Sequence, residues 1–336
     1  MCGTQLKNSK QIEYDLCGLH SYSVILRENG IDMDDKDLFS LLKLYDLRCY
    51  FLDNGIQTCR ISDTADAFCI TGIAPFDEKK INSLSKIVFS KDCCLNDIEA
   101  LNMIRINIRK RHKVIVFADV FYLKYHPLFN RYHSQTQLLI CNENESSIYI
   151  ADYHLPTAPI SVFTGWIPKK EFVQALLIGR NYEQIETSGI VTYTINDAIE
   201  DFPKDIRRAV LENFDTFLNE KFNNSFKIEE QINGLINEMR SKETFQKLAV
   251  SAYAHITGRA GMTLSRKVMA DVLDKLGCDA NGFKSISDNW QGIAGTFFRL
   301  SLRWNPDEVN MICKKICDVI DLKYREINKC IKRLTC

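Results

Sequence analysis

The sequence predicts an α+β protein in which a mixed half with an antiparallel sheet precedes an all-helical half. Short runs rich in β-branched and aromatic residues cluster between residues 113 and 152, and such runs are typical of strands. After residue 190 the apolar residues instead recur every three to four positions, which is the period of helices. We therefore predict two domains, residues 1–182 and residues 190–336.

Two helices are expected before the strands begin. In residues 15–29 the side chains of Leu19, Tyr22 and Leu26 fall three and four positions apart, and Gly30 stands where a helix end favours glycine. Residues 95–112 form the second expected helix, which ends in the basic run "RKRHK".

The central strands are predicted from composition and from one polar turn. Residues 113–123 have the sequence "KVIVFADVFYL", and residues 137–141 and 147–152 have the sequences "QLLIC" and "SIYIAD". The polar residues "NENES" between the last two are typical of a turn, so these two strands should form an antiparallel hairpin. A short helix is expected at residues 168–177.

The C-terminal half contains clear helix signals. Residues 262–276 place Leu264, Val268 and Leu276 on one helical face, and Gly277 follows as a terminator. A second long helix should begin after Asn305 as its N-cap, with Pro306 at the first helical position. We expect this half to contain helices alone.

The composition excludes several classes of function. Lysine plus arginine equals aspartate plus glutamate at 43 each, so we expect neither nucleic acid nor a membrane as a partner. No apolar run approaches the roughly 20 residues of a membrane helix, and we expect a cytoplasmic protein. The 13 cysteines have no repeating spacing, which predicts reduced thiols. No set of metal ligands is evident, so we expect neither a metal nor a resident cofactor.

Two Cys-Gly pairs near the start of the sequence provide two candidate nucleophiles. Cys2 could use its own α-amine as a base once the initiator methionine is removed, but the polar residues after it predict a frayed terminus. Cys17 lies in the first turn of the expected helix 15–29, where the helix dipole favours a thiolate, and Gly18 leaves the sulfur accessible. Gln11 can donate to an oxyanion together with the Cys17 backbone N–H. We therefore favour Cys17.

A base and an orienting carboxylate are expected on the predicted hairpin. Of the six histidines, His126, His133 and His154 remain after those in helices and in the basic run are set aside. His133 precedes one strand of the hairpin and Asp152 ends the other, so antiparallel pairing would bring both to one end of the sheet. We predict His133 as the base and Asp152 as the carboxylate that orients it, with His154 as the alternative base.

These features resemble the butirosin biosynthesis protein H family, whose members are papain-fold acyltransferases related to bacteriocin-processing peptidases. The resemblance rests on the segments "QIEYDLCG", "VIVFADVFYLKYH", "HSQTQLLICNENESSIYIADY" and "APISVFTGWIPKKEFVQAL", which fall within residues 11–178. It implies a papain-like cysteine protease fold for the first domain. It also implies a cysteine that takes an acyl group from the phosphopantetheine thioester of a carrier protein and transfers it to an amine.

The position of the base departs from the family pattern. His133 lies further from Asp152 than the family's histidine lies from its aspartate, and an ungapped register would place Gln135 or Thr136 at the base position. The sequence "CNENES" also replaces the family's G-Y-D turn. The resemblance therefore assigns Cys17 more directly than it assigns His133.

The leading functional prediction is amide-bond formation in natural-product biosynthesis. An acyl or peptidyl group would move from a carrier protein, through a Cys17 acyl-enzyme, to a small amine acceptor. One alternative is a peptidase or thioesterase in which water replaces the amine, and another is a catalytically inactive module that binds a carrier protein. Because carrier proteins are acidic, a basic surface within residues 105–113 or 204–208 is expected to dock the partner.

Overall fold

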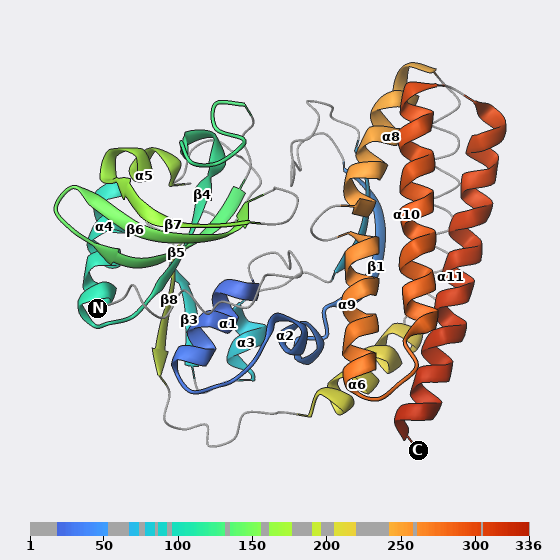
Figure 1. Ribbon diagram of the computed structural model, residues 1–336, viewed down its shortest axis with the longest axis horizontal. Helices are drawn as coiled ribbons and strands as arrows, with labels where there is room; N and C mark the ends of the chain where they lie inside the picture. The colour runs from blue at the N-terminus through green and yellow to red at the C-terminus, as the bar shows by residue number, and fades with distance from the viewer. Residues whose placement is uncertain are drawn as a thin grey trace. The chain divides into compact units, whose positions relative to one another are not determined.

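The computed structural model describes residues 19–52, 67–73, 78–84, 87–92, 96–131, 135–155, 161–176, 190–195, 205–219, 242–257, 261–303 and 305–335. It shows an α+β protein with antiparallel sheets, as the sequence predicts. The described residues form two compact units (Figure 1). The first contains the described residues within Met1–Met33 and Glu78–Phe202, and the second contains those within Asp34–Gln57, Ile61–Asp77 and Pro203–Cys336. None of the helices in these described ranges has the length and apolar character that crossing a bilayer requires.

The first unit is built on a six-stranded antiparallel sheet with the strand order β3-β8-β4-β5-β6-β7 (Figure 1). In chain order its strands are β3 (Ile87–Asp92), β4 (Val114–Asp119), β5 (Gln135–Glu143), β6 (Ser147–Leu155), β7 (Ser161–Pro168) and β8 (Ile190–Ile195). β5 and β6 form the hairpin expected from the sequence, with Ile140 opposite Ile150. Because β6 also pairs with β7, residues on β6 are flanked by a strand on each side.

The two faces of this sheet pack against different helices. On one face, strand residues form an apolar core with α4 (Asp97–Arg109) and α5 (Lys169–Ala175). This core includes Ile104, Val116, Leu138, Ile150 and Phe172. Strand alternation directs Leu139 and Ala151 to the opposite face, where both are fully buried. The helix α1 (Leu19–Glu28) packs against β5.

Local signals in the sequence correctly predict where the first helices end or begin. α1 lies within the expected range 15–29, and Gly30 follows it with a positive φ of 84°, a conformation that glycine adopts without steric penalty. α4 lies within the expected range 95–112, and the Asn96 side chain caps it by accepting the backbone N–H of Glu99 at 3.0 Å.

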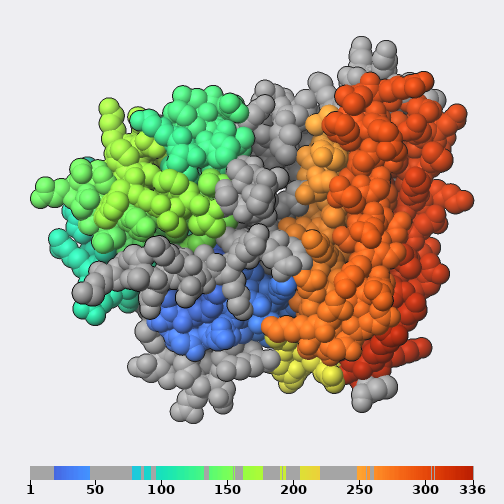
Figure 2. Space-filling model, in the orientation of Figure 1, coloured from blue at the N-terminus to red at the C-terminus, as the bar shows by residue number. Residues whose placement is uncertain are grey.

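The second unit combines helices with a two-stranded hairpin. Its elements are α2 (Asp35–Leu41), β1 (Tyr45–Leu52), β2 (Ala67–Ile73), α6 (Ile206–Asn219), α8 (Lys242–Thr257), α9 (Met262–Lys275), α10 (Asn281–Leu302) and α11 (Pro306–Thr335). β1 pairs antiparallel with β2, which packs against α8 and α9, while α10 packs against α8, α9 and α11. In the space-filling view the side chains of α9, α10 and α11 form a continuous surface (Figure 2).

The predicted ends of the long C-terminal helices are also confirmed. α9 is followed by Gly277, whose φ is 75°. α11 begins at Pro306, and the Asn305 side chain accepts the backbone N–H of Asp307 at 3.1 Å. Each of these ends is fixed by contacts within a few residues, which is why the sequence reveals them.

The division into units differs from the predicted domains 1–182 and 190–336. α2 and the β1–β2 hairpin come from the N-terminal half, yet they belong to the second unit. The contacts of Tyr45 explain this assignment. Its ring packs edge-on against Phe214 with 5.8 Å between the ring centroids, and its backbone carbonyl accepts the Asn213 side chain at 3.1 Å. Packing between residues so far apart in sequence leaves no local signal.

The expectation that the C-terminal half contains helices alone is wrong. β8 has the sequence "IVTYTI" and pairs antiparallel with all of β3 and with part of β4. Ile190 and Tyr193 are buried within the first unit. Six alternating residues are a weak signal next to a long helical region, and β8 is a strand because β3 and β4 supply its hydrogen-bonding partners.

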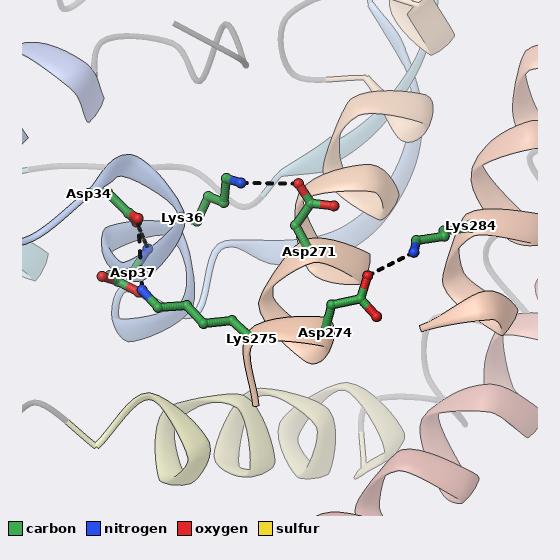
Figure 3. A network of polar contacts seen from close by, with 7 residues as sticks. All are labelled: Asp34, Lys36, Asp37, Asp271, Asp274, Lys275 and Lys284. Atoms are coloured by element: carbon green, nitrogen blue, oxygen red, sulfur yellow. Dashed lines mark hydrogen bonds and ion pairs between the residues drawn. The ribbon is translucent and has the colours of Figure 1, made fainter. Parts of the chain in front are cut away.

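Ion pairs tie α2 to α9, and α9 to α10, within the second unit (Figure 3). Lys275 donates to Asp37 at 2.5 Å, and the Asp37 side chain is only 12% exposed. Lys284 donates to Asp274 at 2.7 Å, and both of these side chains are about half exposed. Burial raises the pKa of Asp37, and the hydrogen bond from Lys275 opposes that rise. The two lysine–aspartate pairs therefore differ mainly in how far the carboxylate is buried.

We predict that Lys275→Met lowers the free energy of unfolding by about 1 kcal/mol, because it leaves the mostly buried carboxylate of Asp37 without its cation. Lys284→Met, the matched control at an exposed pair, should cost much less, because solvent screens that pair. Urea unfolding followed by circular dichroism at neutral pH measures both. The cost of Lys275→Met should shrink as the pH falls and Asp37 is protonated. Equal losses for the two variants would contradict this account.

Candidate functional site

The residues predicted for catalysis fall into two groups. Asp152 lies in β6 with its side chain described, and for His154, also in β6, the structure describes the backbone only. The remaining candidates lie outside the described residues; they are Cys2, Gln11, Cys17 and His133. Among the predicted site residues, Asp152 is therefore the one whose side-chain contacts the structure describes.

Asp152 is a fully buried carboxylate at the end of the apolar sheet face. Strand alternation places it on the same face of β6 as Ile148 and Ile150. The Tyr125 hydroxyl donates to its Oδ2 at 2.9 Å, and the Thr136 hydroxyl donates to its Oδ1 at the longer distance of 3.4 Å. Burying a carboxylate is costly unless donors compensate it, so these hydroxyls help to hold Asp152 in place.

The ring of Tyr125 is itself fixed by a neighbouring strand. Phe163 of β7 lies directly across from Asp152 in the β6–β7 register. The rings of Tyr125 and Phe163 are stacked, with 3.8 Å between their centroids and an interplanar angle of 8°. Burial raises the pKa of Tyr125 well above its ordinary value, and the negative charge of Asp152 raises it further. The Tyr125 hydroxyl is therefore a donor at every pH at which the protein functions.

Tyr125 belongs to a compact segment that follows β4. The predicted strand 113–123 is shorter than expected, because β4 ends at Asp119 and the 3₁₀ turn η2 (Val120–Tyr122) follows. The Asp119 carboxylate caps this turn by accepting the backbone N–H of Phe121 at 3.0 Å. Asp119 begins the run "DVFYL" (residues 119–123), which therefore turns the backbone toward Tyr125.

Glu171 of α5 fastens the same segment from the other side. Its carboxylate accepts the backbone N–H of Lys124 at 2.9 Å and pairs with the Lys124 ammonium at 3.5 Å. The Glu171 side chain is buried. Because Lys124 immediately precedes Tyr125, this contact fixes the backbone from which the Tyr125 ring extends.

The start of α1 lies beside the end of β6 that carries Asp152. His20, in the first turn of α1, packs against Tyr153 with 4.5 Å between the ring centroids and an interplanar angle of 62°. Tyr153 directly follows Asp152 in β6. Two residues further along α1, Tyr22 donates to Glu78 of α3 (Glu78–Asn82) at 2.9 Å. These contacts fix both the position and the direction of the helix that follows Cys17.

The described side chains of three histidines show structural roles. The His126 ring is buried, and its Nδ1 accepts the backbone N–H of Leu128 at 3.1 Å, which caps its own loop. The His112 ring packs on Tyr193, and burial together with the charge of Lys110 lowers its pKa. His20 packs against Tyr153, as described above. His133 and His154 stay the candidates for the base.

Among the cysteine side chains that the structure describes, those of Cys278, Cys313 and Cys330 are free thiols, as the sequence predicts. Burial raises the pKa of Cys313 to about 12 and that of Cys330 to about 11. Thiols with such values are poor nucleophiles at neutral pH. Within the described part of the chain, no group of three or more histidine, cysteine or acidic residues is arranged to hold a metal ion.

Sequence reasoning missed Tyr125 as part of this site. An ungapped register places Gln135 or Thr136 at the base position, and of these Thr136 is the residue that donates to Asp152. Tyr125 itself lies two residues after the run "DVFYL". A tyrosine in a loop, however, gives no indication of which buried carboxylate it will meet.

Comparison of the sequence with protein-family models finds no match, and neither does comparison with curated proteins.

We predict that Glu171→Ala loosens the segment that carries Tyr125, because the backbone N–H of Lys124 loses its acceptor at a cost of about 1–3 kcal/mol. Glu171→Gln, the matched control, keeps an acceptor oxygen and should have a smaller effect. Hydrogen exchange measured on peptides that cover residues 120–131 reports the loosening. Equal protection of these peptides in both variants would show that Glu171 does not fasten the segment.

Proposed function

We propose that this protein is an amide-forming acyltransferase that uses Cys17 as its nucleophile and Asp152 to orient its base. The observation that carries the proposal is the contact between the first turn of α1 and Tyr153, next to Asp152. Cys17 precedes the first residue of α1 by two positions, which supports a site shared by the two. A nucleophile at a helix start beside an antiparallel sheet is the arrangement of the papain-like fold, which we propose for the first unit.

The base of such a site has to lie where the β5–β6 hairpin ends. Asp152 contacts Tyr125 on one side of the sheet, whereas Tyr153 contacts α1 on the other. An imidazole that serves both Asp152 and a nucleophile before α1 therefore has to lie near the end of the sheet that carries Asp152. His133 precedes β5 by two residues, and we propose it as the base, with His154 as the alternative.

The proposed reaction has two steps. The Cys17 thiolate attacks the acyl carbon of a carrier-bound thioester, the bond from that carbon to the phosphopantetheine sulfur breaks, and the leaving sulfur takes a proton from the imidazolium. Gln11 and the Cys17 backbone N–H donate to the oxyanion. An amine then attacks the acyl-enzyme, the imidazole accepts an N–H proton, and the Cys17 thiolate leaves. Because an amide is more stable than a thioester, the transfer proceeds without ATP.

We predict that the purified protein gains the mass of an acyl group when it is mixed with simple acyl thioesters. Intact-protein mass spectrometry should show this gain in the native protein and in Cys2→Ala, and no gain in Cys17→Ala. His133→Ala should slow the gain by at least about 100-fold, the usual contribution of a general base, and His154→Ala should change it little. A gain that disappears only in Cys2→Ala would instead indicate an N-terminal nucleophile.

The choice of an amine rather than water as the acceptor rests on the family resemblance, so the same experiment must separate the two. When an amine is added, an acyltransferase releases an amide, and without an amine its acyl-enzyme persists. A peptidase or thioesterase releases the free acid under both conditions. An absence of any acyl adduct would favour the inactive carrier-binding module.

An acidic carrier protein is the partner that fits this function, and one basic surface is available to it. Both candidate surfaces contain residues that already form ion pairs. Arg105 pairs with Glu143, Lys113 with Glu28, and Arg208 with Glu212. The consecutive residues 109–111, at the end of α4, are exposed. Ile106, one turn earlier, is 52% exposed. An exposed basic cluster with an apolar neighbour suits an acidic helix.

We predict that reversing charge in this cluster with Arg109→Glu and Lys110→Glu raises the KM for a carrier-bound thioester about 10-fold, because electrostatic attraction is lost. The kcat value and the reaction with a small-molecule thioester should not change. Arg325→Glu, at an exposed position of α11, is the control. An equal rise in KM for the small thioester would contradict carrier docking at this surface.

A further inference from the structure

The hydrogen bond between Tyr125 and Asp152 suggests a role beyond packing. Asp152 is fully buried, and the Tyr125 hydroxyl donates to it at 2.9 Å, a normal length for a bond between two oxygen atoms. The carboxylate is the residue proposed to orient the catalytic base. A group that holds the carboxylate therefore also influences the base.

We propose that Tyr125 is a positioning residue for the reaction, which keeps the Asp152 carboxylate fixed in the orientation that the catalytic imidazole requires. This inference rests on the proposed function, because it assigns Asp152 to the catalytic site. Thr136 donates to the other carboxylate oxygen. Because this hydrogen bond is longer, at 3.4 Å, we expect Thr136 to contribute less than Tyr125 to holding the carboxylate in place.

The surroundings of Tyr125 are suited to positioning because they leave its ring little freedom. The ring is stacked on Phe163, which lies across from Asp152 in the sheet. The backbone just before it is bound by Glu171 through the N–H of Lys124. The hydroxyl is therefore directed at Asp152 before any substrate arrives, and a donor that needs no reorganisation is what electrostatic preorganisation requires.

A carboxylate supports a neighbouring imidazolium most strongly when its oxygens are held facing the ring. The Tyr125 hydroxyl holds one of the two Asp152 oxygens at 2.9 Å. Loss of this hydroxyl therefore lets the carboxylate turn, weakens the support of the imidazolium, and makes the thiolate of Cys17 harder to form at low pH.

The test measures the alkylation of Cys17 by iodoacetamide as a function of pH, with peptide mass spectrometry on the full-length protein. Alkylation reports the thiolate directly, so the identity of the acyl donor does not enter. Tyr125→Phe removes the hydroxyl and keeps the ring that stacks on Phe163. Thr136→Val removes the second hydroxyl at nearly the same volume. Tyr149→Phe, on the same strand as Asp152 with its ring against Trp166, is the matched control.

In the native protein the alkylation midpoint should lie well below the value of about 8.5 for a free cysteine. We expect Tyr125→Phe to move the midpoint to higher pH by about one unit, which is the size expected for one hydrogen bond to a charged group. Thr136→Val should give a smaller shift in the same direction, and Tyr149→Phe should give none. A variant that merely loosened the fold would change the rate at every pH and leave the midpoint unchanged.

The outcomes separate this inference from the proposed function. If the native midpoint is low and Tyr125→Phe leaves it unchanged or lowers it, the positioning role is overturned and the Cys17 site stands. If the native midpoint equals that of a free thiol, the activated cysteine itself is overturned, and the positioning role fails with it. A low native midpoint that rises in Tyr125→Phe and not in Tyr149→Phe establishes Tyr125 as the positioning residue.

Discussion

The buried carboxylate of Asp152 is the constraint on which the first unit is organised. A carboxylate inside a sheet is stable only where donors reach it, and its donors here come from different parts of the chain. Tyr125 belongs to the segment after β4, and Thr136 belongs to β5. For both to reach Asp152, β5 and β6 must pair in one register and the segment after β4 must fold back over β7. The same interaction therefore fixes the local fold and the candidate site.

In the second unit, contacts between buried cations and aromatic rings stabilise the packing of the β1–β2 hairpin, and no buried carboxylate of the described residues has that role. The guanidinium of Arg266 lies 4.6 Å from the centroid of the Tyr45 ring, and the ammonium of Lys323 lies 3.6 Å from that of Phe217. Both cations are fully buried. A cation over a ring is favoured most where water is excluded, so these contacts explain why a segment from the N-terminal half packs with the C-terminal helices.

The proposed chemistry depends partly on local sequence and partly on contacts that form only in the folded protein. A thiol at a helix start owes its reactivity to the helix dipole, which any sequence with a cysteine at that position supplies. Orientation of its base is different, because it requires the Asp152 carboxylate to be fixed in place before the substrate arrives. The stacking of Tyr125 on Phe163 and the contact of Glu171 with Lys124 supply that rigidity. In this proposal the helix start makes the thiol reactive, and the sheet with its adjoining segment orients the base.

The sequence by itself determined the α+β class, the β5–β6 hairpin and the ends of the helices. Gly30, Gly277 and Asn305 act within a few residues of their own positions, so their effects can be inferred from neighbours alone. Tertiary structure decided that β8 belongs to the sheet, that β1 and β2 pack with the C-terminal helices, and that Tyr125 meets Asp152. Each of these depends on a partner far away in the sequence. A pattern of residues indicates that a side chain or strand needs a partner. Which partner it contacts is determined only when the chain has folded.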